Sequence, residues 1–503
     1  MTTFPVTFHV PAKSAEPANA SSSMEGFDFI IRGMTVRQFS PGKYVAVAKS
    51  GDWELLSGET LNLLADSTIT LPTELSARLI SKFLITSPFE GNGTALLRKA
   101  RSTAKHATVR LGPSLHIIVP TLQCAHSCQY CQVSRALGSE GHTMNIDDLD
   151  AACDQVFESS AQTLTVEFQG GDPLLRFDLV KRAVLRIVNR NQRERRTLRF
   201  VIASTLHQLT LEICEFCREH GIYLSTSIDG PPWLHNRNRP TKERDAYERT
   251  LDGIRMAREV MGPDSVSALM TTTRLSLAHP HEIVDEYVQL GFHEIFVRPL
   301  SSYGFAKRNQ ARLGYSVGEF QSFYEAALDR VLWWNARGVP IREVYASIIC
   351  NKILSTFDAG YVDLQSPTGA GSSVIVYNYD GYVYPSDEAR MLAETGDDSL
   401  RMRAIRENER ESFPKVVESL RQASEPDTAE GCRTCAYHAY CGPNPVDAQA
   451  QHGSMNVHAH DTEHCARHLS MFDNMFKRLA NAPEYLLDVY CAWGKPVGTG
   501  TAL

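Results

Sequence analysis

The sequence predicts an α/β fold: a partial (β/α)6 TIM-type barrel, preceded by a small α+β domain and followed by a cysteine-rich domain. Two observations predict the barrel. Between about residues 115 and 300, six apolar runs typical of buried strands alternate with amphipathic stretches typical of helices. Three closely spaced cysteines directly follow the first run, and active sites of such barrels lie at the carboxyl ends of their strands.

Composition and turn signals divide the rest of the chain. The first residues are rich in Ala, Ser and Pro, which predicts a disordered tail. Short runs in which apolar and polar residues alternate predict the α+β domain, and a stretch of basic residues after it predicts a linker. Beyond the barrel, a Gly-rich hairpin turning near Asp380 and Gly381 precedes the second group of cysteines. The predicted boundaries are 1–24 for the tail, 25–97 for the α+β domain, 98–112 for the linker, 113–340 for the barrel, 341–425 for a bridging region with the hairpin, 426–490 for the cysteine-rich domain and 491–503 for a second tail.

The charge and hydropathy of the chain exclude several functions. The net charge is -7, with 51 basic and 58 acidic residues, so no bulk positive field attracts nucleic acid or an anionic membrane. No run approaches the roughly 20 apolar residues of a membrane span, and the first residues lack the pattern of a signal peptide. We therefore expect a cytoplasmic protein, in which the twelve cysteines serve as thiols or metal ligands rather than disulfides.

The stretch "TLQCAHSCQYCQVSR" holds Cys124, Cys128 and Cys131 and no fourth cysteine. Three thiolates on one loop can bind three irons of a [4Fe–4S] cluster and leave the fourth iron open. Zinc fits less well, because a structural zinc site is closed by four ligands, although His126 or His142 could supply one. Three unrelated buried cysteines are the remaining alternative.

The spacing Cys-x3-Cys-x2-Cys, with Tyr130 before the last cysteine, resembles the cluster loop of the radical S-adenosylmethionine (radical SAM) enzymes. The resemblance implies that the amino and carboxylate groups of S-adenosylmethionine chelate the open iron. It also implies that an electron from the cluster cleaves the sulfonium to give a 5′-deoxyadenosyl radical. A fourth cysteine would block that position.

Two later motifs strengthen the resemblance. "FQGGDP" is similar to the family's Gly-Gly-Glu-Pro motif, which implies that Gly170 and Gly171 hold the amino group of the cofactor, with Asp172 where Glu is usual. "STSIDGPPWLHNRNRP" resembles a stretch of peptide-modifying and protein-modifying members, which implies that Ser227 bonds the ribose or carboxylate and that Arg239 pairs with the carboxylate. An ordinary strand-to-helix turn and a structural arginine are the alternatives.

The second group of cysteines could close a site completely. "CRTCAYHAYCGPNP" and the later "EHC" supply Cys432, Cys435, Cys441 and Cys465, enough to bind every iron of a second [4Fe–4S] cluster. Such a cluster would transfer electrons or hold the domain together. On spacing alone, zinc bound by four thiolates remains an alternative.

The arrangement resembles the SPASM domain, whose complete form carries two auxiliary clusters. Here Pro445 and Ser386 stand at two of the expected cysteine positions, and the upstream segment has Ser366 and Thr368 but no cysteine. The missing positions belong to the auxiliary cluster nearer the substrate. The resemblance therefore implies two [4Fe–4S] clusters in all, one open with three cysteine ligands and one closed with four.

The residue after Ser386 is a candidate for catalysis. Asp387 matches the position at which protein-oxidising relatives carry an aspartate proposed as general base. An equally good interpretation is that Asp387 pairs with Arg390 on a surface turn.

Over most of residues 25–480 the chain resembles the His-Xaa-Ser system radical SAM maturases, for example in "GPSLHIIVPTLQCAHSCQYCQVSR" and "VYNYDGYVYPSDEARMLAE". The resemblance implies that hydrogen abstraction leads to a crosslink or another oxidation in a ribosomally made precursor peptide. The implied partners are that peptide, an electron donor such as flavodoxin or ferredoxin, and a second radical SAM maturase. The α+β domain loosely resembles domains that capture a leader peptide as an added strand, or it caps the barrel.

Two other functions stay open. One is a sulfatase-maturating-type protein oxidase, which the missing auxiliary cysteines weaken. The other, of a different class, is a non-catalytic iron–sulfur redox scaffold or sensor, which would not need the cofactor motifs in this order.

Overall fold

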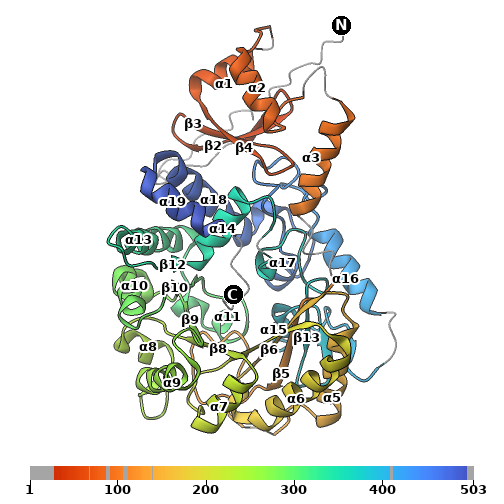
Figure 1. Ribbon diagram of the computed structural model, residues 1–503, viewed down its shortest axis with the longest axis vertical. Helices are drawn as coiled ribbons and strands as arrows, with labels where there is room; N and C mark the ends of the chain where they lie inside the picture. The colour runs from red at the N-terminus through yellow and green to blue at the C-terminus, as the bar shows by residue number, and fades with distance from the viewer. Residues whose placement is uncertain are drawn as a thin grey trace.

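The computed structural model describes residues 28–495 apart from 67, 87–90, 106–111, 139, 359 and 408–411. The predicted tail over 1–24 lies outside the described residues. Figure 1 shows the small N-terminal domain at one end of the molecule and the barrel at the other. Within the part of the chain that is described, no helix is both long enough and apolar enough to cross a membrane.

The barrel has the predicted six parallel strands. They lie in the order β11-β9-β8-β7-β6-β5, so each strand pairs with its predecessor through a crossover helix. The strands are β5 (Leu115–Thr121), β6 (Thr163–Gly170), β7 (Thr197–Ala203), β8 (Ile222–Ser227), β9 (Val266–Thr271) and β11 (Val297–Arg298). The helices between them are α5 (Ile146–Gln155), α6 (Phe177–Glu194), α7 (Leu211–Glu219), α8 (Pro232–Asn238), α9 (Ala246–Met261) and α10 (Pro280–Gln289). The fold class is confirmed.

The predicted hairpin extends the barrel sheet and does not stand apart in a bridging region. β13 (Val374–Tyr377) pairs in parallel with β5, and β14 (Tyr382–Tyr384) returns antiparallel to it beside β15 (Arg403–Ala404). The first strand of the barrel would otherwise present an open edge of unpaired backbone groups, which β13 covers. Among the described residues the sheet thus has nine strands, and β13 lies beside the strand that leads to the first cysteines.

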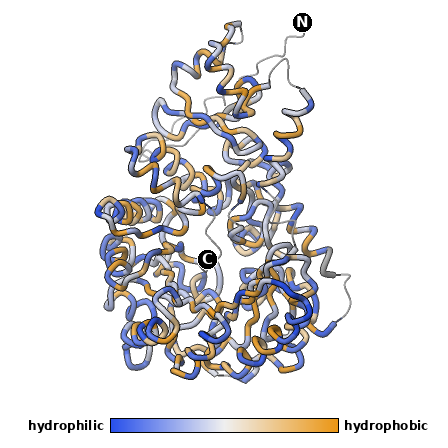
Figure 2. The backbone as a smooth tube through the Cα atoms, in the orientation of Figure 1, coloured by the Kyte–Doolittle hydropathy of each residue, from blue (hydrophilic) through white to orange (hydrophobic). Residues whose placement is uncertain are grey.

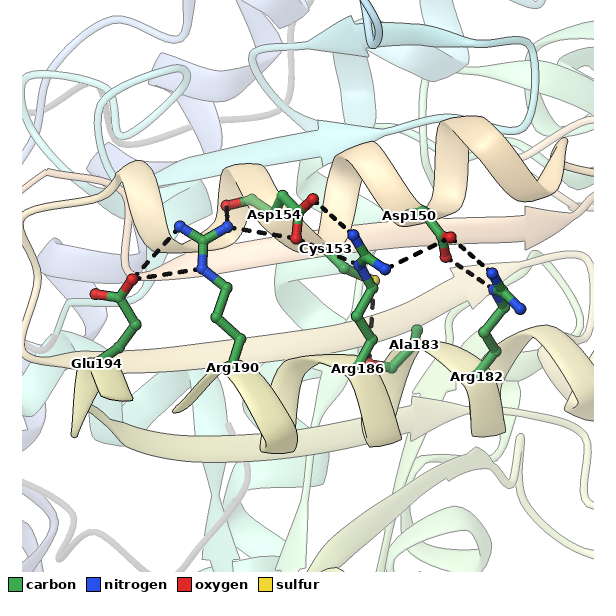
Figure 3. A network of polar contacts seen from close by, with 8 residues as sticks. All are labelled: Asp150, Cys153, Asp154, Arg182, Ala183, Arg186, Arg190 and Glu194. Carbon is green, nitrogen blue, oxygen red and sulfur yellow. Dashed lines mark hydrogen bonds and ion pairs between the residues drawn. The ribbon is translucent and has the colours of Figure 1, made fainter. Parts of the chain in front are cut away.

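Ion pairs join the outer surfaces of α5 and α6 (Figure 3). Arg182 donates to Asp150 and Arg186 donates to Asp154, both with N–O distances of 2.7 to 2.8 Å, and Arg190 reaches the carbonyl of Asp154 at 3.0 Å. The three arginines recur every fourth residue and so share one face of the helix. This face of α6 lies on the outside of the barrel, and the figure shows the three arginine side chains directed at the neighbouring helix.

The N-terminal domain is a four-stranded antiparallel sheet with helices after it. Its strands, in spatial order, are β1 (Asp28–Ile31), β2 (Met34–Ser40), β3 (Lys43–Val47) and β4 (Trp53–Ser57). The helices are α1 (Gly58–Ala65), α2 (Thr73–Ser81) and α3 (Asn92–Lys105). The linker predicted over 98–112 is wrong for its first half, because residues 98–105 complete α3, where a run of basic residues is compatible with an exposed helical face.

The remaining elements lie between the barrel and the N-terminal domain or flank the hairpin (Figure 1). They are α11 (Gly304–Arg308), α12 (Gln310–Leu313), α13 (Val317–Asn335), α14 (Val344–Leu354), α15 (Asp387–Ala393), α16 (Ser412–Ala423), α17 (Pro445–His452), α18 (Glu463–Asn481) and α19 (Glu484–Trp493), with β10 (Glu294–Ile295) paired to β12 (Arg342–Glu343). The tail predicted from 491 is wrong at its start, since α19 continues to Trp493. In Figure 2 hydrophilic and hydrophobic residues alternate along these helices, as expected where one face packs and the other meets solvent.

Candidate functional site

The first cysteine group lies on the loop that follows β5, and neighbouring segments hold that loop from two sides. The amide of Ser127 donates to the carbonyl of Pro240 at 2.9 Å, and the amide of Phe305 donates to the carbonyl of Cys131 at 2.8 Å. A Cβ on Gly304 would lie 2.3 Å from the carbonyl oxygen of Gln132, so α11 approaches the loop closely only because glycine stands there. The loop is therefore fixed by backbone contacts.

Gly170 and Gly171 at the end of β6 pack directly on the start of the cysteine loop. A Cβ on Gly170 would lie 2.2 Å from the carbonyl oxygen of Thr121, and one on Gly171 would lie 2.2 Å from that of Leu122. The amide of Gly171 donates to Thr121 at 2.9 Å. Because Gly170 and Gly171 have no side chains, the end of β6 can lie against the end of β5. This packing requires glycine whether or not a cofactor binds here.

Asp172 faces away from the space beside the cysteines. Its buried carboxylate accepts hydrogen bonds from the Ser204 hydroxyl at 2.7 Å and from the amides of Leu174 and Thr205 at 3.2 Å. Burial raises the pKa of this carboxyl group. Ser204 and Thr205 line the neighbouring cavity and Asp172 does not, so this residue positions the ends of β6 and β7.

A buried carboxylate joins two of the predicted cofactor residues. The Tyr130 hydroxyl donates to Asp229 at 2.5 Å, and the Arg239 guanidinium donates to the same carboxylate at 3.2 and 3.3 Å. Burial disfavours the charge of Arg239, but the charge of Asp229 outweighs this effect and holds the pKa of the guanidinium well above its ordinary value. Guanidinium has five N–H donors, so donors remain for a ligand carboxylate.

One cavity of about 370 Å³ collects most of the predicted residues, a volume typical of small-molecule sites. From the barrel it is lined by Cys124, Cys128, Tyr130, Cys131, Gly170, Gly171, Ser227 and Arg239. From the elements after β11 it is lined by Tyr345, Glu388, Asn444, Asp447, His464, Arg467 and His468. The carboxyl ends of the barrel strands therefore face residues of the cysteine-rich domain across a single space.

The thiols of the first group line the cavity in surroundings that disfavour their charged form. Burial raises the pKa of Cys124 well above its ordinary value and that of Cys128 to about 12. Both thiols would stay protonated at neutral pH without a metal, whereas coordination stabilises the thiolate form. The three cysteines beside an open cavity fit an iron–sulfur cluster that leaves room for S-adenosylmethionine.

The four cysteines of the second group surround a small hollow of their own, formed by the segment before α17 and the start of α18. Cys432, Cys435, Cys441 and Cys465 all line it. Burial raises the pKa of Cys432 to about 11 and that of Cys465 to about 12. These thiols also need a bound metal to ionise.

The distances between the ligand atoms bear on the choice between zinc and an iron–sulfur cluster. Zinc–sulfur bonds of 2.3 Å in a tetrahedron would bring the sulfurs to within about 3.8 Å of one another. Among the described residues, the group of candidate ligand atoms that lie within 4.8 Å of one another is formed by Cys441, His464 and His468, so it contains only one cysteine of the second group and none of the first. In a cubane each sulfur binds a different iron, so the open arrangement fits clusters at both sites.

Asp387 does not line the cavity. It is the first residue of α15, and its carboxylate accepts from Arg390 at 2.9 and 2.5 Å. The Arg390 side chain is fully buried, so Asp387 is its counter-ion, and the pair lies inside the protein instead of on a surface turn. The next residue, Glu388, does line the cavity, and the sequence analysis missed it.

The positions at which the SPASM pattern expects further cysteines have other roles here. The Ser386 hydroxyl caps α15 by accepting from the amide of Ala389 at 3.2 Å. Pro445 is the first residue of α17, and the Asn444 side chain caps that helix. Capping and a helix-starting proline explain why these residue types suit positions that bind no metal.

Comparison with known proteins agrees with this site. The Radical SAM superfamily model matches residues 118–287. The PqqA peptide cyclase of Bradyrhizobium diazoefficiens is 26% identical over 225 residues, 44% of this chain and 55% of that protein. An uncharacterized protein of Methanothermobacter thermautotrophicus is 25% identical over 178 residues, 35% of this chain and 64% of its own length. The chain thus spans less than two thirds of the length of both relatives.

Solved structures share the fold. Native anSMEcpe with bound AdoMet superposes with a TM-score of 0.61 at 16% identity, covering 73% of this chain and 98% of the other. Streptococcus suis SuiB bound to the precursor peptide SuiA superposes with a TM-score of 0.51 at 14% identity, covering 86% and 98%. The chain is thus similar to the Radical SAM superfamily over residues 118–287, which carry the cysteine loop and most of the barrel.

Proposed function

We propose that this enzyme modifies a ribosomally made precursor peptide, forming a crosslink or another oxidised product after radical hydrogen abstraction. One observation carries the proposal: the cavity beside the three-cysteine loop is also walled by the domain that holds the four-cysteine site. A peptide side chain in this space would lie between a place where a radical forms and a place that can accept an electron.

The proposed cofactors are S-adenosylmethionine and two [4Fe–4S] clusters. When bound, the open cluster supplies the electron that cleaves S-adenosylmethionine. Arg239, held by Asp229, would orient the cofactor carboxylate, and Ser227 would bond its ribose or carboxylate. Backbone carbonyls around Gly170 and Gly171 would accept hydrogen bonds from the amino group of the cofactor.

A peptide substrate agrees with the names of the relatives. One relative is a PqqA peptide cyclase, and SuiB was solved with its precursor peptide. In the N-terminal domain, β1 and β4 are the edges of the sheet, and an edge can bind an extended leader through main-chain hydrogen bonds. On the resemblance of the sequence, the proposal includes leader binding at such an edge and a precursor peptide with His-Xaa-Ser repeats. It also includes a flavodoxin or ferredoxin as electron donor, a second radical SAM maturase as partner and a cytoplasmic location.

The alternatives are less well supported. A sulfatase-maturating-type oxidase that uses Asp387 as base would need that carboxylate free, whereas Arg390 engages it. A non-catalytic scaffold would not explain a cavity that brings the first cysteine group together with Arg239, Ser227 and residues of the domain that holds the second group.

The experiment incubates anaerobically reconstituted, reduced enzyme with S-adenosylmethionine and a synthetic precursor peptide containing His-Xaa-Ser repeats. We expect 5′-deoxyadenosine and a peptide product lighter by two hydrogens per modification. Replacing the buried Cys153, Cys214 and Cys217 by alanine is the matched control, because these cysteines lie outside both cysteine groups, and it should retain both products. Formation of 5′-deoxyadenosine without any peptide product, for the repeat peptide and for full-length precursors alike, would contradict the proposed function.

A further inference from the structure

His468 on α18 lies where three hollows of the molecule meet. It borders the large cavity, the hollow among the four cysteines and a narrow gap between them, and it is the only described residue that borders all three. Its side chain is 4% exposed. One of its ring nitrogens lies within 4.8 Å of the Cys441 sulfur.

Tyr345, at the start of α14, connects His468 with the large cavity. Its hydroxyl lies 2.9 Å from Nε2 of His468, and the two rings are 6.0 Å apart at an angle of 74°. Tyr345 borders the large cavity and neither of the two smaller hollows. The side chains therefore form a continuous row from the cavity through Tyr345 and His468 to Cys441.

The hydrogen bonds define how His468 is used. Its Nδ1 lies 2.8 Å from the carbonyl of His464, which can only accept, so Nδ1 carries the hydrogen and Nε2 accepts from Tyr345. His464 likewise uses Nε2 toward the carbonyl of Gly442 at 3.1 Å. Because both nitrogens of His468 are engaged, the group Cys441, His464 and His468 does not act as a metal site of its own.

This row lies between the large cavity and the hollow among the four cysteines. Residues Ser386 and Pro445, at two positions where the SPASM pattern expects cysteines, cap or begin helices instead. An electron that leaves the cavity for the four-cysteine site has to pass through protein at this point. The phenol of Tyr345 and the imidazole of His468, joined by a hydrogen bond, offer the electron a more strongly coupled path than a route through space between aliphatic side chains.

We propose that Tyr345 and His468 are the path by which the electron of the oxidised peptide reaches the four-cysteine site; this inference rests on the proposed function. After abstraction, a peptide carbon holds one unpaired electron. Bond formation to a nitrogen, oxygen or sulfur of the peptide releases one proton from that nucleophile and one electron from the radical. The electron passes to the four-cysteine centre, which a soluble one-electron carrier reoxidises, and the proton leaves through the cavity.

The first test measures peptide product per 5′-deoxyadenosine in Tyr345→Phe and His468→Gln. The expected result is a ratio at least fivefold lower than in wild type, with 5′-deoxyadenosine formation within twofold of it. Tyr490→Phe is the matched control, because it removes another buried hydroxyl on α19, away from the cavity. An unchanged ratio in Tyr345→Phe would overturn the proposal.

The second test needs no peptide. In the Cys124→Ala/Cys128→Ala/Cys131→Ala background, an electron paramagnetic resonance titration follows the four-cysteine centre alone. His468→Gln should shift its midpoint potential or its spectrum, whereas Tyr490→Phe should not. Identical spectra and potentials would contradict the placement of His468 beside that centre. Because this measurement is independent of substrate, it distinguishes failure of the electron path from failure of the proposed function.

Discussion

The guanidinium of Arg239 lies over the ring of Tyr130, with 5.2 Å between its central carbon and the ring centroid, and both side chains bond Asp229. One residue of the pair comes from the cysteine loop and the other from the end of α8. The carboxylate between them thus couples the position of the cluster loop to the position of the predicted cofactor arginine.

Replacing Asp229 by Asn should destabilise the protein and weaken cofactor binding together. The change leaves the buried Arg239 charge without its partner, which costs roughly 3–5 kcal/mol in comparable buried pairs. Thermal unfolding and S-adenosylmethionine affinity, measured by equilibrium dialysis, check this. The control is Asp252→Asn, whose pair with Arg255 is 67% exposed on both sides and should contribute less than about 1 kcal/mol. Unchanged affinity in Asp229→Asn would contradict the coupling.

Gly171→Ala should disturb the first cluster site specifically. The added methyl group would lie 2.2 Å from the carbonyl oxygens of Leu122 and Gln123, so the cysteine loop has to move. We expect the variant to lose most of the iron of the open site and to keep that of the four-cysteine site. Iron analysis and spectra of the reduced protein measure this. Gly318→Ala, where nothing lies within 4 Å, should retain both centres.

Asp387→Asn and Glu388→Gln should act differently although the two residues are adjacent. The first leaves the buried Arg390 without its counter-ion and should lower the melting temperature. The second changes a group that lines the cavity and should raise the KM for the peptide with little effect on melting. Steady-state kinetics with melting curves separate the two. A large loss of turnover in Asp387→Asn at unchanged melting temperature would restore the catalytic interpretation of Asp387.

Acid should weaken the fold through His116 on β5. Burial lowers the pKa of this imidazole to about 4. The unfolded chain, with a pKa near 6.5, binds more protons between these values, so stability is lost as the pH falls below about 6.5. From pH 7.5 to pH 5.5 the wild type should lose about 1 kcal/mol more than His116→Gln. Denaturant unfolding at both pH values measures the difference, and equal losses would contradict the assignment.

Local patterns in the sequence were sufficient for the barrel strands and for both cysteine groups, because periodicity and ligand spacing are short-range properties. The pairing of β13 with β5 was not predictable in this way, since 259 residues separate partners such as His116 and Ile375. The sequence also did not predict the direction in which a motif side chain points. Asp172 and Asp387 matched family motifs, yet both carboxylates turn toward buried partners, which only packing determines. Tyr345 carried no motif, and its place on the cavity wall follows from the docking of α14.

The central claim is that three cysteines hold an open cluster at the cavity and four hold a closed one beyond it. Iron and sulfide content of reconstituted protein, with 5′-deoxyadenosine formation after reduction, tests it most directly. We predict about eight irons in wild type and about four in Cys124→Ala/Cys128→Ala/Cys131→Ala, with loss of the nucleoside. About four irons together with bound zinc in wild type, or nucleoside formation by the triple variant, would contradict the account.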